Sequence, residues 1–407
     1  MNLKNSPYKV EKINSFRKKI EIPSSKSYAN RALILGALMG NQFKITNVPN
    51  STDVQNLITC LQQIGLRIVK NKNEIVFENS FPACELTTKE KIVLNTGDGG
   101  TTNRFLLALL ALGSNTYELI PSEKMGERPM IELVNALREL GVQVNLGENS
   151  WIEIQGPMNF AEKKVIEVDC SRSTQFASAL KLVLFNQRIK INLKNLQSSE
   201  DYVHMTEKVI HEASKHHGVK IPVDFSSLGY PVALAAVTGE VEISNCHFID
   251  DFQADSILLE LLEESGAIVQ FNEHGLMVKN NGKLNAFKVD GSDCPDLMMT
   301  LAFLASYASE TSEIQGVSIL RHKESDRLEG ILKILHDFQV AHVYDIENDT
   351  LMITGRTFTN DQKVIFTERD HRMVMMAYLY LKVNGGGELY NVDCVEKSFP
   401  NFLDAME

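Results

Sequence analysis

One construction recurs along this chain: an apolar strand, a short polar turn, and then a helix that is apolar almost all round. The turns are rich in Ser, Thr, Gly, Asp, Lys and Arg, and they lie at Ser24–Ser27, Gly97–Thr102, Ser171–Gln175, Asp224–Ser227, Asp293–Asp296 and Glu368–Arg372. A helix that is apolar on every side must be buried on every side. The pattern therefore predicts an α/β fold with six buried helices.

A second pattern recurs after these helices: an amphipathic helix that ends near a glycine, and then a two-stranded ribbon. It occurs around Gly65, Gly141, Gly218 and Gly266 and, without the glycine, around Gln339. A glycine at this position fits a left-handed helix C-cap, and the alternation after it is typical of strands. Polar turns between ribbon strands are expected at residues 71–74, 147–150 and 347–349.

Each copy then has the order βαβαββ, and most successive copies are separated by roughly 75 residues, which we treat as an internal repeat. Six copies divide into two groups of three, with a boundary near Pro222–Asp224. An ordinary α/β alternation is the alternative. Helices this apolar, each following a polar turn, favour a true repeat.

Length, composition and net charge limit the classes of protein to which this chain can belong. The 407-residue length allows two domains, and 43% hydrophobic with 23% charged residues is typical of a soluble globular protein. No apolar run reaches the length of a membrane span, and the N-terminus lacks an apolar signal region. The six cysteines form no Cys-x-x-Cys pair, which predicts a reduced, cytoplasmic protein without metal. The net charge of −11 argues against nucleic acid or an acidic membrane as partner, although a local basic cluster can still bind a small anion.

The polar turns are candidate anion sites. Each feeds a helix start, where free N–H groups and a partial positive charge favour anions. Lys26, Ser27 and Arg31 lie at the first start, and the turn Gly97–Thr102 allows close backbone approach to a phosphate or carboxylate. That turn is neither a Walker A loop nor a dinucleotide-binding fingerprint. Six such starts predict a small, multiply charged anionic ligand.

Further charged and polar residues border apolar segments. Arg128 precedes a helix-starting proline, Ser171–Gln175 offers more donors than helix capping needs, and Asp370–Arg372 precedes a core helix. Considered alone, Lys323–Arg327 is typical of a solvated helix start and Lys397 of a surface residue.

Taken together, seven motifs point to one family. In chain order they are Ser25–Arg31, Glu127–Pro129, Ser171–Phe176, Pro295–Thr300, Lys323–Arg327, Asp370–Met373 and Lys397–Pro400. Along nearly its whole length the chain resembles the EPSP synthases (3-phosphoshikimate 1-carboxyvinyltransferases) of the enolpyruvyl transferase family. Lys-Glu-Ser-Asp-Arg and Asp-His-Arg-Met are the most specific of these motifs.

The resemblance implies two similar domains, each of three βαβαββ units with buried parallel helices, an arrangement called an inverse α/β barrel. We expect the first domain at residues 20–222 and the second at residues 1–19 and 223–407, with the active site in the cleft between them. We also expect the domains to close when anions neutralise their facing basic surfaces.

The implied enzyme belongs to the shikimate pathway to chorismate and the aromatic amino acids. It transfers the enolpyruvyl group of phosphoenolpyruvate to the 5-hydroxyl of shikimate 3-phosphate and releases phosphate. The resemblance implies a cytoplasmic monomer whose partners are these two small molecules, without a cofactor or metal.

Site residues follow from the matching motifs. The residues expected to bind phosphoenolpyruvate are Lys26, Asp98, Gly100, Arg128, Gln175, Arg327, Arg372 and Lys397. Those expected to bind shikimate 3-phosphate are Ser27, Arg31, Ser173, Thr174, Gln175, Ser199, Tyr202, Asp296 and Lys323. Asp296, Glu324 and Lys26 are the expected catalytic residues. Asp296 would orient or deprotonate the attacking hydroxyl, and Glu324 or Lys26 would move the methyl-group proton.

Three departures from the family pattern stand out. Asp98 replaces a usual asparagine, and its carboxylate would be protonated, paired with Arg104 or another cation, or turned away. Ile319 replaces a common asparagine, and Glu200-Asp201 replaces a frequent Lys-Pro before Tyr202. Two rival functions remain: the sister transferase that acts on UDP-N-acetylglucosamine, and an inactive anion-binding homologue.

Overall fold

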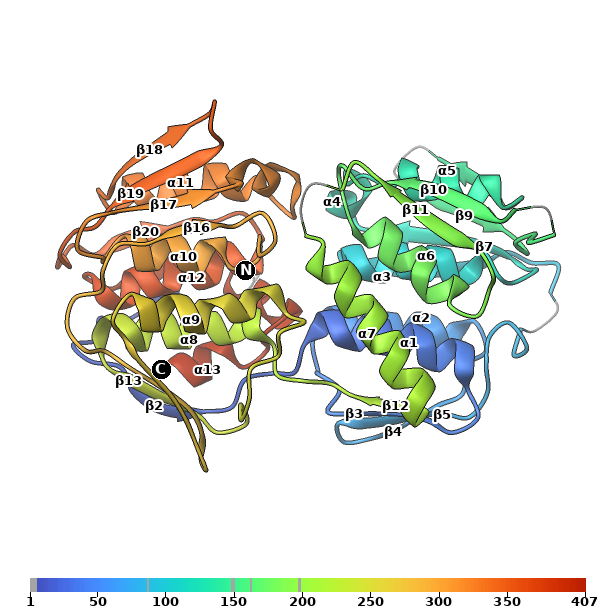
Figure 1. Ribbon diagram of the computed structural model, residues 1–407, viewed down its shortest axis with the longest axis horizontal. Helices are drawn as coiled ribbons and strands as arrows, with labels where there is room; N and C mark the ends of the chain where they lie inside the picture. The colour runs from blue at the N-terminus through green and yellow to red at the C-terminus, as the bar shows by residue number, and fades with distance from the viewer. Residues whose placement is uncertain (1–5, 86–87, 148–150, 162, 197–198) are drawn as a thin grey trace. The chain divides into compact units, whose positions relative to one another are not determined.

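The computed structural model describes residues 6–85, 88–147, 151–161, 163–196 and 199–407. The chain divides into two compact units, which we call the first unit (Ser24–Pro222) and the second unit (Met1–Pro23 and Val223–Glu407). Each unit has its own hydrophobic core. Figure 1 shows that each consists of helices with strands outside them.

The first unit contains seven helices in its described part. They are α1 (Lys26–Met39), α2 (Thr52–Gln63), α3 (Gly100–Leu110), α4 (Glu123–Gly126), α5 (Ile131–Glu139), α6 (Gln175–Leu184) and α7 (Asp201–His216). Its strands are β3 (Phe43–Thr46), β4 (Ile68–Asn71), β5 (Glu74–Phe77), β6 (Ile92–Gly97), β7 (Thr116–Pro121), β8 (Gln143–Leu146), β9 (Ile152–Gln155), β10 (Val165–Asp169), β11 (Lys190–Lys194) and β12 (Gly218–Lys220). They form sheets in the orders β12-β3-β5-β4, β6-β7-β9-β8 and β10-β11.

The second unit repeats this plan. Its helices are α8 (Phe225–Thr238), α9 (Ile257–Glu264), α10 (Met298–Ala305), α11 (Arg327–Asp337), α12 (His371–Val383) and α13 (Phe402–Met406), with 3-10 turns η3 (Ala254–Ser256), η4 (Val317–His322) and η5 (Val392–Lys397). Its strands are β1 (Tyr8–Val10), β2 (Arg17–Ile20), β13 (Glu240–Ile243), β14 (Ile268–Asn272), β15 (Gly275–Lys279), β16 (Lys288–Asp290), β17 (Thr311–Gln315), β18 (Ala341–Asp345), β19 (Thr350–Thr354), β20 (Lys363–Ile365) and β21 (Gly387–Leu389). The sheet orders are β14-β15-β13-β2, β16-β17-β19-β18 and β1-β21-β20.

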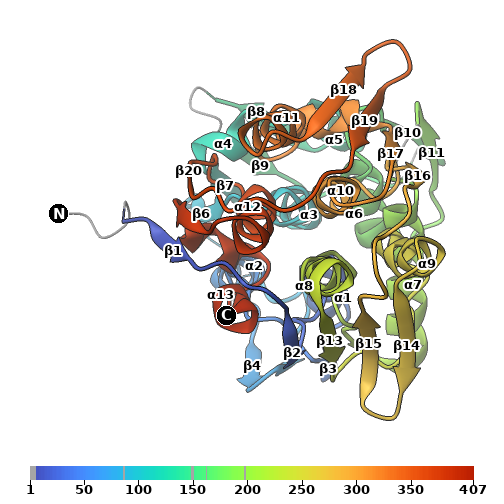
Figure 2. The same cartoon turned by 90° about the vertical axis from the view of Figure 1, so that its left-hand side faces the viewer.

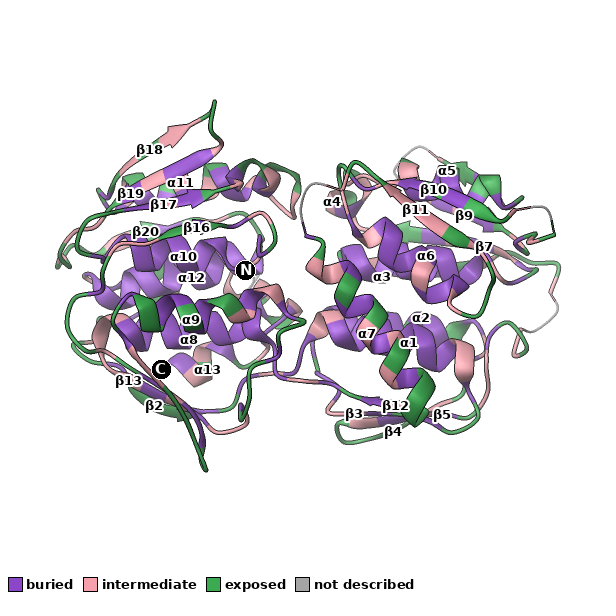
Figure 3. Ribbon diagram, viewed as in Figure 1, coloured by how far each residue is buried: buried purple, intermediate pink, exposed green. Residues whose placement is uncertain are grey.

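The apolar helices form the interior of each unit, as their sequence predicts. In the first unit α1, α3 and α6 pack against one another, and in the second α8, α10 and α12 do so. Every residue of α3, α10 and α12 is buried. Figure 2 looks along the three inner helices of the second unit, with strands around them, and Figure 3 shows the inner helices of both units as buried.

Side-chain caps fix where several of these helices begin. Ser25 accepts a hydrogen bond from the backbone N–H of Tyr28 at the start of α1. Asp224 and Asp370 cap α8 and α12 in the same way. An aspartate at a helix N-cap satisfies a free N–H group and complements the helix dipole. In these three copies the polar turn therefore supplies the side chain that caps the helix after it.

The start of the first unit differs from the expectation by a few residues. We expected a strand ahead of the turn Ser24–Ser27 and a domain boundary at residue 20, and β2 (Arg17–Ile20) pairs in parallel with β13 of the second unit. Residues 20–23, assigned above to the first domain, therefore belong to the second unit. At the other end of the first unit, β12 pairs in parallel with β3 of the same unit, so the ribbon expected after Gly218 is a single strand.

The predicted left-handed glycine C-caps are confirmed at three positions. Gly65, Gly141 and Gly266 have φ values of 103°, 81° and 98°. At the fourth, His217 takes the left-handed conformation with φ 50° and Gly218 begins β12, so that prediction was wrong.

The expected turns after β4 and β18 are present, whereas residues 148–150 of the third lie outside the described residues. None of the described helices has the length and apolar character needed to cross a membrane.

Candidate active site

Two arginines hold the carboxylate of Asp296 in the second unit. Arg327 Nη1 donates to Oδ1 of Asp296 and Arg372 Nη2 donates to Oδ2, each at 2.8 Å. Asp296 lies just before α10, Arg327 begins α11 and Arg372 is the second residue of α12, so three helix starts bring these groups together. Burial alone would lower the pKa of Arg372, but Asp296 raises it well above its ordinary value. Both guanidinium groups therefore stay charged.

Asp370 fixes the position of Arg327. It is fully buried, and its Oδ2 accepts hydrogen bonds from Arg327 Nε at 2.8 Å and from the Ser325 hydroxyl at 3.1 Å. Arg327 itself is 2% exposed. Planar guanidinium–carboxylate contacts of this kind hold an arginine in one orientation. Arg327 is thus aimed at Asp296 by a carboxylate behind it.

Glu324 lies between a lysine and a histidine. Its Oε1 is 3.1 Å from Lys397 Nζ and its Oε2 is 3.0 Å from His371 Nδ1. Burial acts to raise the pKa of Glu324, but Lys397 and His371 hold it well below its usual range. Glu324, Asp370 and His371 have the donor atoms of a metal site. Because Lys397 and Arg327 already neutralise these carboxylates, we interpret the group as an ion-pair network.

A second carboxylate, Asp255, lies near Asp296. It is 3% exposed, accepts a hydrogen bond from the Ser226 hydroxyl, and its Oδ1 has no hydrogen-bond partner among the described residues. Burial and the charge of Asp296 raise the pKa of Asp255 to about 7, although Arg372 and Ser226 act in the opposite direction. Asp255 therefore holds its proton far better than an exposed aspartate.

In the first unit, two arginines converge on Gly100 at the start of α3. A Cβ atom built on Gly100 would lie 2.9 Å from Arg128 Nη1 and 3.1 Å from Arg104 Nη1. Arg104 donates to Gln175 Oε1 at 2.6 Å and to the backbone oxygen of Pro129 at 2.7 Å. Burial, followed by the neighbouring Arg128, lowers the pKa of Arg104 well below its ordinary value. Two cations at a helix N-terminus make this an environment that favours an anion.

Lys26 and Asp98 each contact another polar side chain of the first unit. Lys26 Nζ is 3.1 Å from Oδ2 of Asp53, which is 4% exposed. Asp98 is exposed and accepts a hydrogen bond from the hydroxyl of Ser122, the N-cap of α4. Arg104 contacts Gln175 and Pro129 instead. The Asp98 side chain is therefore directed at the start of α4 rather than paired with Arg104.

Arg31 is buried in the first unit. Its guanidinium donates to the Thr206 hydroxyl at 2.7 Å and to the backbone oxygens of Ser27 and Tyr202 at 2.9 Å. It also lies over the Tyr202 ring. Burial lowers the pKa of Arg31 to about 10. Arg31 thus ties α1 to α7, the elements that carry Ser27 and Tyr202.

The remaining expected residues lie at element ends. Ser173 Oγ accepts from the backbone N–H of Gln175 at 3.3 Å, and Thr174 is the N-cap of α6. Ser199 is buried with a left-handed φ of 57°. Lys323 is half-buried at the end of η4. In each unit, therefore, most of the expected residues lie at or near helix starts.

Sequence reasoning gave no role in binding or catalysis to four residues that the structure places in these clusters: Asp53, Arg104, Asp255 and His371. Each contacts an expected site residue directly or through its charge. Asp53 follows Ser51-Thr52 at a helix start, where an acidic residue is usually explained by the helix dipole. The signals available in the sequence were Arg104, a charged residue inside an apolar helix, and His371, a polar residue at the start of one.

Comparisons with known proteins agree with this architecture. The model of the EPSP synthase (3-phosphoshikimate 1-carboxyvinyltransferase) family matches residues 10–216 and again residues 210–406. The 3-phosphoshikimate 1-carboxyvinyltransferase of Pyrococcus abyssi is 32% identical over 97% of this chain and 95% of its own, and that of Shewanella halifaxensis is 29% identical over 97% of each. A solved structure of EPSP synthase from Acinetobacter baumannii aligns with a TM-score of 0.77 at 20% identity, covering 98% of this chain and 97% of that one. The double match and the shared architecture confirm the predicted fold of two similar domains, and the chain belongs to the EPSP synthase (3-phosphoshikimate 1-carboxyvinyltransferase) family.

Proposed function

We propose that this protein is a 3-phosphoshikimate 1-carboxyvinyltransferase, which transfers the enolpyruvyl group of phosphoenolpyruvate to the 5-hydroxyl of shikimate 3-phosphate and releases phosphate. The observation that supports this most is the carboxylate of Asp296 held by Arg327 and Arg372 in a chain of this family. The carboxylate can accept a proton, and the arginines can bind an anion beside it.

We assign one set of residues to each of the two substrates. Arg128 over Gly100 and, in the other unit, Arg327 and Arg372 offer planar donors for the carboxylate and phosphate of phosphoenolpyruvate. Lys26, Gln175 and Lys397 complete this set. We assign shikimate 3-phosphate to Ser27, Ser173, Thr174, Ser199, Tyr202 and Lys323, with Arg31 holding the elements that present them. In this proposal both clusters act on one pair of substrates.

Asp296 has the central chemical role in this proposal. An anion that binds Arg327 and Arg372 partly neutralises their positive charge. Asp296 is then stabilised less as a carboxylate and becomes a stronger base for the 5-hydroxyl. General base catalysis of this type contributes about 10²- to 10⁴-fold to a rate. The hydroxyl oxygen attacks C2 of phosphoenolpyruvate while its methylene carbon gains a proton. The tetrahedral intermediate then loses phosphate together with a proton of the new methyl group, which restores the C=C bond of the enolpyruvyl product.

The proton for the methylene carbon comes from Glu324 or Lys26. Both side chains are in ion pairs, Glu324 with Lys397 and Lys26 with Asp53. Substrate anions that draw Lys397 away would raise the pKa of Glu324 and allow it to carry a proton. We therefore favour a change of ion-pair partner for Lys397 when the substrates bind.

We further propose that the enzyme is a cytoplasmic monomer. Light scattering of the purified protein tests the oligomeric state.

A phosphate-release assay tests the proposed function. Phosphate should appear when phosphoenolpyruvate is combined with shikimate 3-phosphate, and not when it is combined with UDP-N-acetylglucosamine. Asp296→Asn should lower kcat by about 10²- to 10⁴-fold while phosphoenolpyruvate still binds. Asp251→Asn, at an exposed aspartate of the same unit, is the matched control. Turnover with the UDP-sugar alone would assign the sister activity, and binding without turnover would indicate an inactive homologue.

A further inference from the structure

A cavity of about 240 Å³ lies in the second unit where α8 and α10 end. Asp296 lies just before the start of α10, whereas this cavity lies at the other end of the helix, about 12 Å along its axis. The lining residues are Val237, Asn280, Gly282, Lys283, Leu284, Tyr307, Arg356, Thr357 and Phe358. None of them is among the residues assigned to either substrate. Sites for drug-sized molecules measure about 300–1,000 Å³, so this smaller cavity suits a ligand with a single ring.

Arg356 gives the cavity a positive charge that no carboxylate compensates. Its Nε donates to the backbone oxygen of Thr357 and its Nη1 to that of Gln339, each at 3.1 Å, and Nη1 also donates to the backbone oxygen of Phe338. These neutral partners hold the guanidinium without cancelling its charge. In the described part of the chain Arg356 forms no ion pair, and its Nη2 has no hydrogen-bond partner. None of the described lining residues is acidic, and Lys283 is a second, exposed cation.

Tyr307 and Phe358 form an aromatic wall beside this charge. Their ring centroids are 4.8 Å apart at an angle of 51°. Tyr307 is buried, whereas Phe358 is 43% exposed and can accept a further ring. Burial raises the pKa of Tyr307, although Asn384 and then the charge of Arg356 act in the opposite direction. The cation and the aromatic wall therefore lie near each other.

The rest of the lining is apolar or already hydrogen-bonded. Leu284 is buried and Val237 is half-buried. Asn280 donates to the backbone oxygens of Ala236 at 2.6 Å and of Gly282 at 2.9 Å. Asn280 is thus a fixed part of the wall, and the cavity combines an apolar interior with positive charge.

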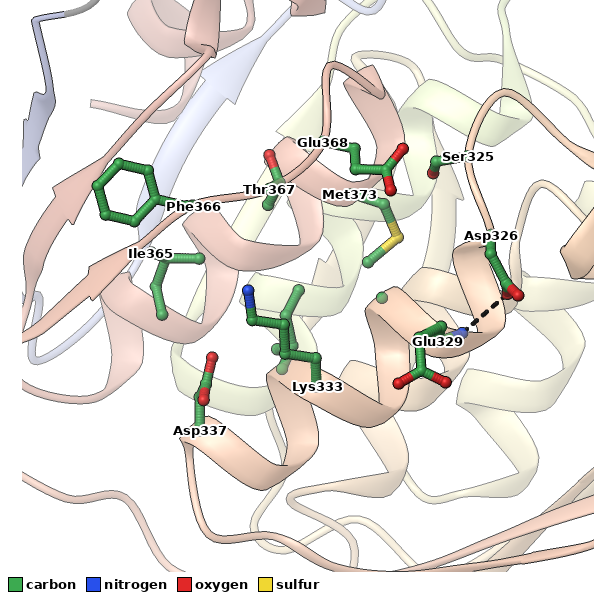
Figure 4. A pocket seen from close by; sticks show the side chains of 12 residues that line it. Ser325, Asp326, Glu329, Lys333, Asp337, Ile365, Phe366, Thr367, Glu368 and Met373 are labelled. Atoms are coloured by element: carbon green, nitrogen blue, oxygen red, sulfur yellow. Dashed lines mark hydrogen bonds between the residues drawn. The ribbon is translucent and has the colours of Figure 1, made fainter.

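A larger cavity of the same unit, about 330 Å³, has the opposite character. Figure 4 shows it between α11 and the segment that runs from β20 to α12. Its lining includes Asp326, Glu329, Asp337 and Glu368 beside a single cation, Lys333. Carboxylates repel an anion. The α11 cavity therefore serves as an internal comparison for a site that favours anions.

We propose that the cavity at the ends of α8 and α10 binds a small aromatic carboxylate. The carboxylate would accept hydrogen bonds from Nη2 of Arg356 and pair with Lys283, and the ring would pack on Phe358. A neutral ring would leave Arg356 without a counter-ion, and a small anion without a ring would leave the apolar wall uncovered. A monoanion that carries one ring satisfies both features.

Titration calorimetry of the full chain with phenylacetate tests this proposal without any measurement of turnover. 2-Phenylethanol keeps the ring without the charge, and acetate keeps the charge without the ring. We expect one phenylacetate to bind per chain, and each analogue to bind at least about tenfold more weakly because it loses the charge-assisted contact or the buried ring. Saturating phosphoenolpyruvate should not displace phenylacetate. No binding of phenylacetate, equal affinity for the three compounds, or displacement by phosphoenolpyruvate would overturn the proposal.

Variants locate the binding. Arg356→Gln and Phe358→Ala should each weaken phenylacetate binding by about tenfold, through the lost charge and the lost ring contact. Lys333→Gln removes a positive charge from the α11 cavity instead and should leave the affinity unchanged.

Arg356 also holds the backbone of Phe338 and Gln339, so the thermal midpoint of Arg356→Gln is measured beside its affinity. Phe358→Ala leaves those contacts in place and tests the site by itself if Arg356→Gln fails to fold. Unchanged affinity in Phe358→Ala, or an equal loss in Lys333→Gln, would place phenylacetate elsewhere and reject this site.

Discussion

The amine of Lys397 lies 3.1 Å from Oε1 of Glu324, and neither side chain is more than 14% exposed. An ion pair this well buried keeps each partner charged because the other is present. A substrate anion that takes Lys397 as its partner would leave Glu324 with His371 alone. This pair therefore links anion binding to the protonation of the candidate acid.

Glu324→Gln separates the two roles of this pair. The amide cannot carry the transferred proton, so we expect kcat to fall by about 10²-fold or more. Lys397 would at the same time lose its carboxylate partner, and the KM for phosphoenolpyruvate should fall. Steady-state phosphate release measures both constants, with Glu264→Gln at an exposed position as the control. A kcat equal to that of the wild type would remove Glu324 from the chemical step.

The buried pair of Arg327 and Asp370 should matter for stability as well as for geometry. Asp370→Asn leaves Arg327 with less compensation for its buried charge, and breaking a buried pair costs about 3–5 kcal/mol. We expect a loss of stability of this order in urea unfolding followed by fluorescence. Glu167→Gln, which breaks the exposed pair with Lys194, should cost less than about 1 kcal/mol. Equal effects of the two substitutions would contradict the prediction.

Gly100→Ala tests the close approach of Arg128 to α3. The new methyl group would lie 2.9 Å from Arg128 Nη1, which is the end of a flexible side chain and can move away. We expect the KM for phosphoenolpyruvate to rise by about tenfold or more, because small displacements of a positioning group are costly. The thermal midpoint should change little. A larger rise in the KM for shikimate 3-phosphate would show that Arg128 serves the other substrate.

Much of the fold could be predicted because the buried helices are marked by their composition. A run such as Phe105–Leu112 has no polar face, so its burial follows from the sequence alone. The residue at which the first unit begins could not be predicted. Arg17–Ile20 reads as a strand in either unit, and its pairing with β13 is a long-range choice that local sequence does not encode.

The candidate site was predictable where a residue belongs to a specific motif. Arg327 and Arg372 came from such motifs, and the structure brings both to Asp296. Arg104 and Asp53 were missed because their importance lies in what they contact, Gln175 and Lys26, rather than in their own sequence surroundings. Partners that are distant along the chain become visible only when the helices are packed.

Asp255 should make the folded protein less stable as the pH rises. Its pKa is raised from the ordinary range to about 7 in the folded state, first by burial and then by Asp296. Between about pH 4 and pH 7 the unfolded chain has released this proton whereas the folded protein retains it, so this contribution to stability is complete below about pH 4 and is lost as the pH rises through about 7. Asp255→Asn cannot ionise and keeps a partner for Ser226. Urea midpoints measured from pH 5 to pH 8 should therefore fall less steeply in Asp255→Asn than in the wild type, while Asp251→Asn should follow the wild type. Parallel curves for the wild type and Asp255→Asn would mean that Asp255 is already ionised in the folded protein at pH 5.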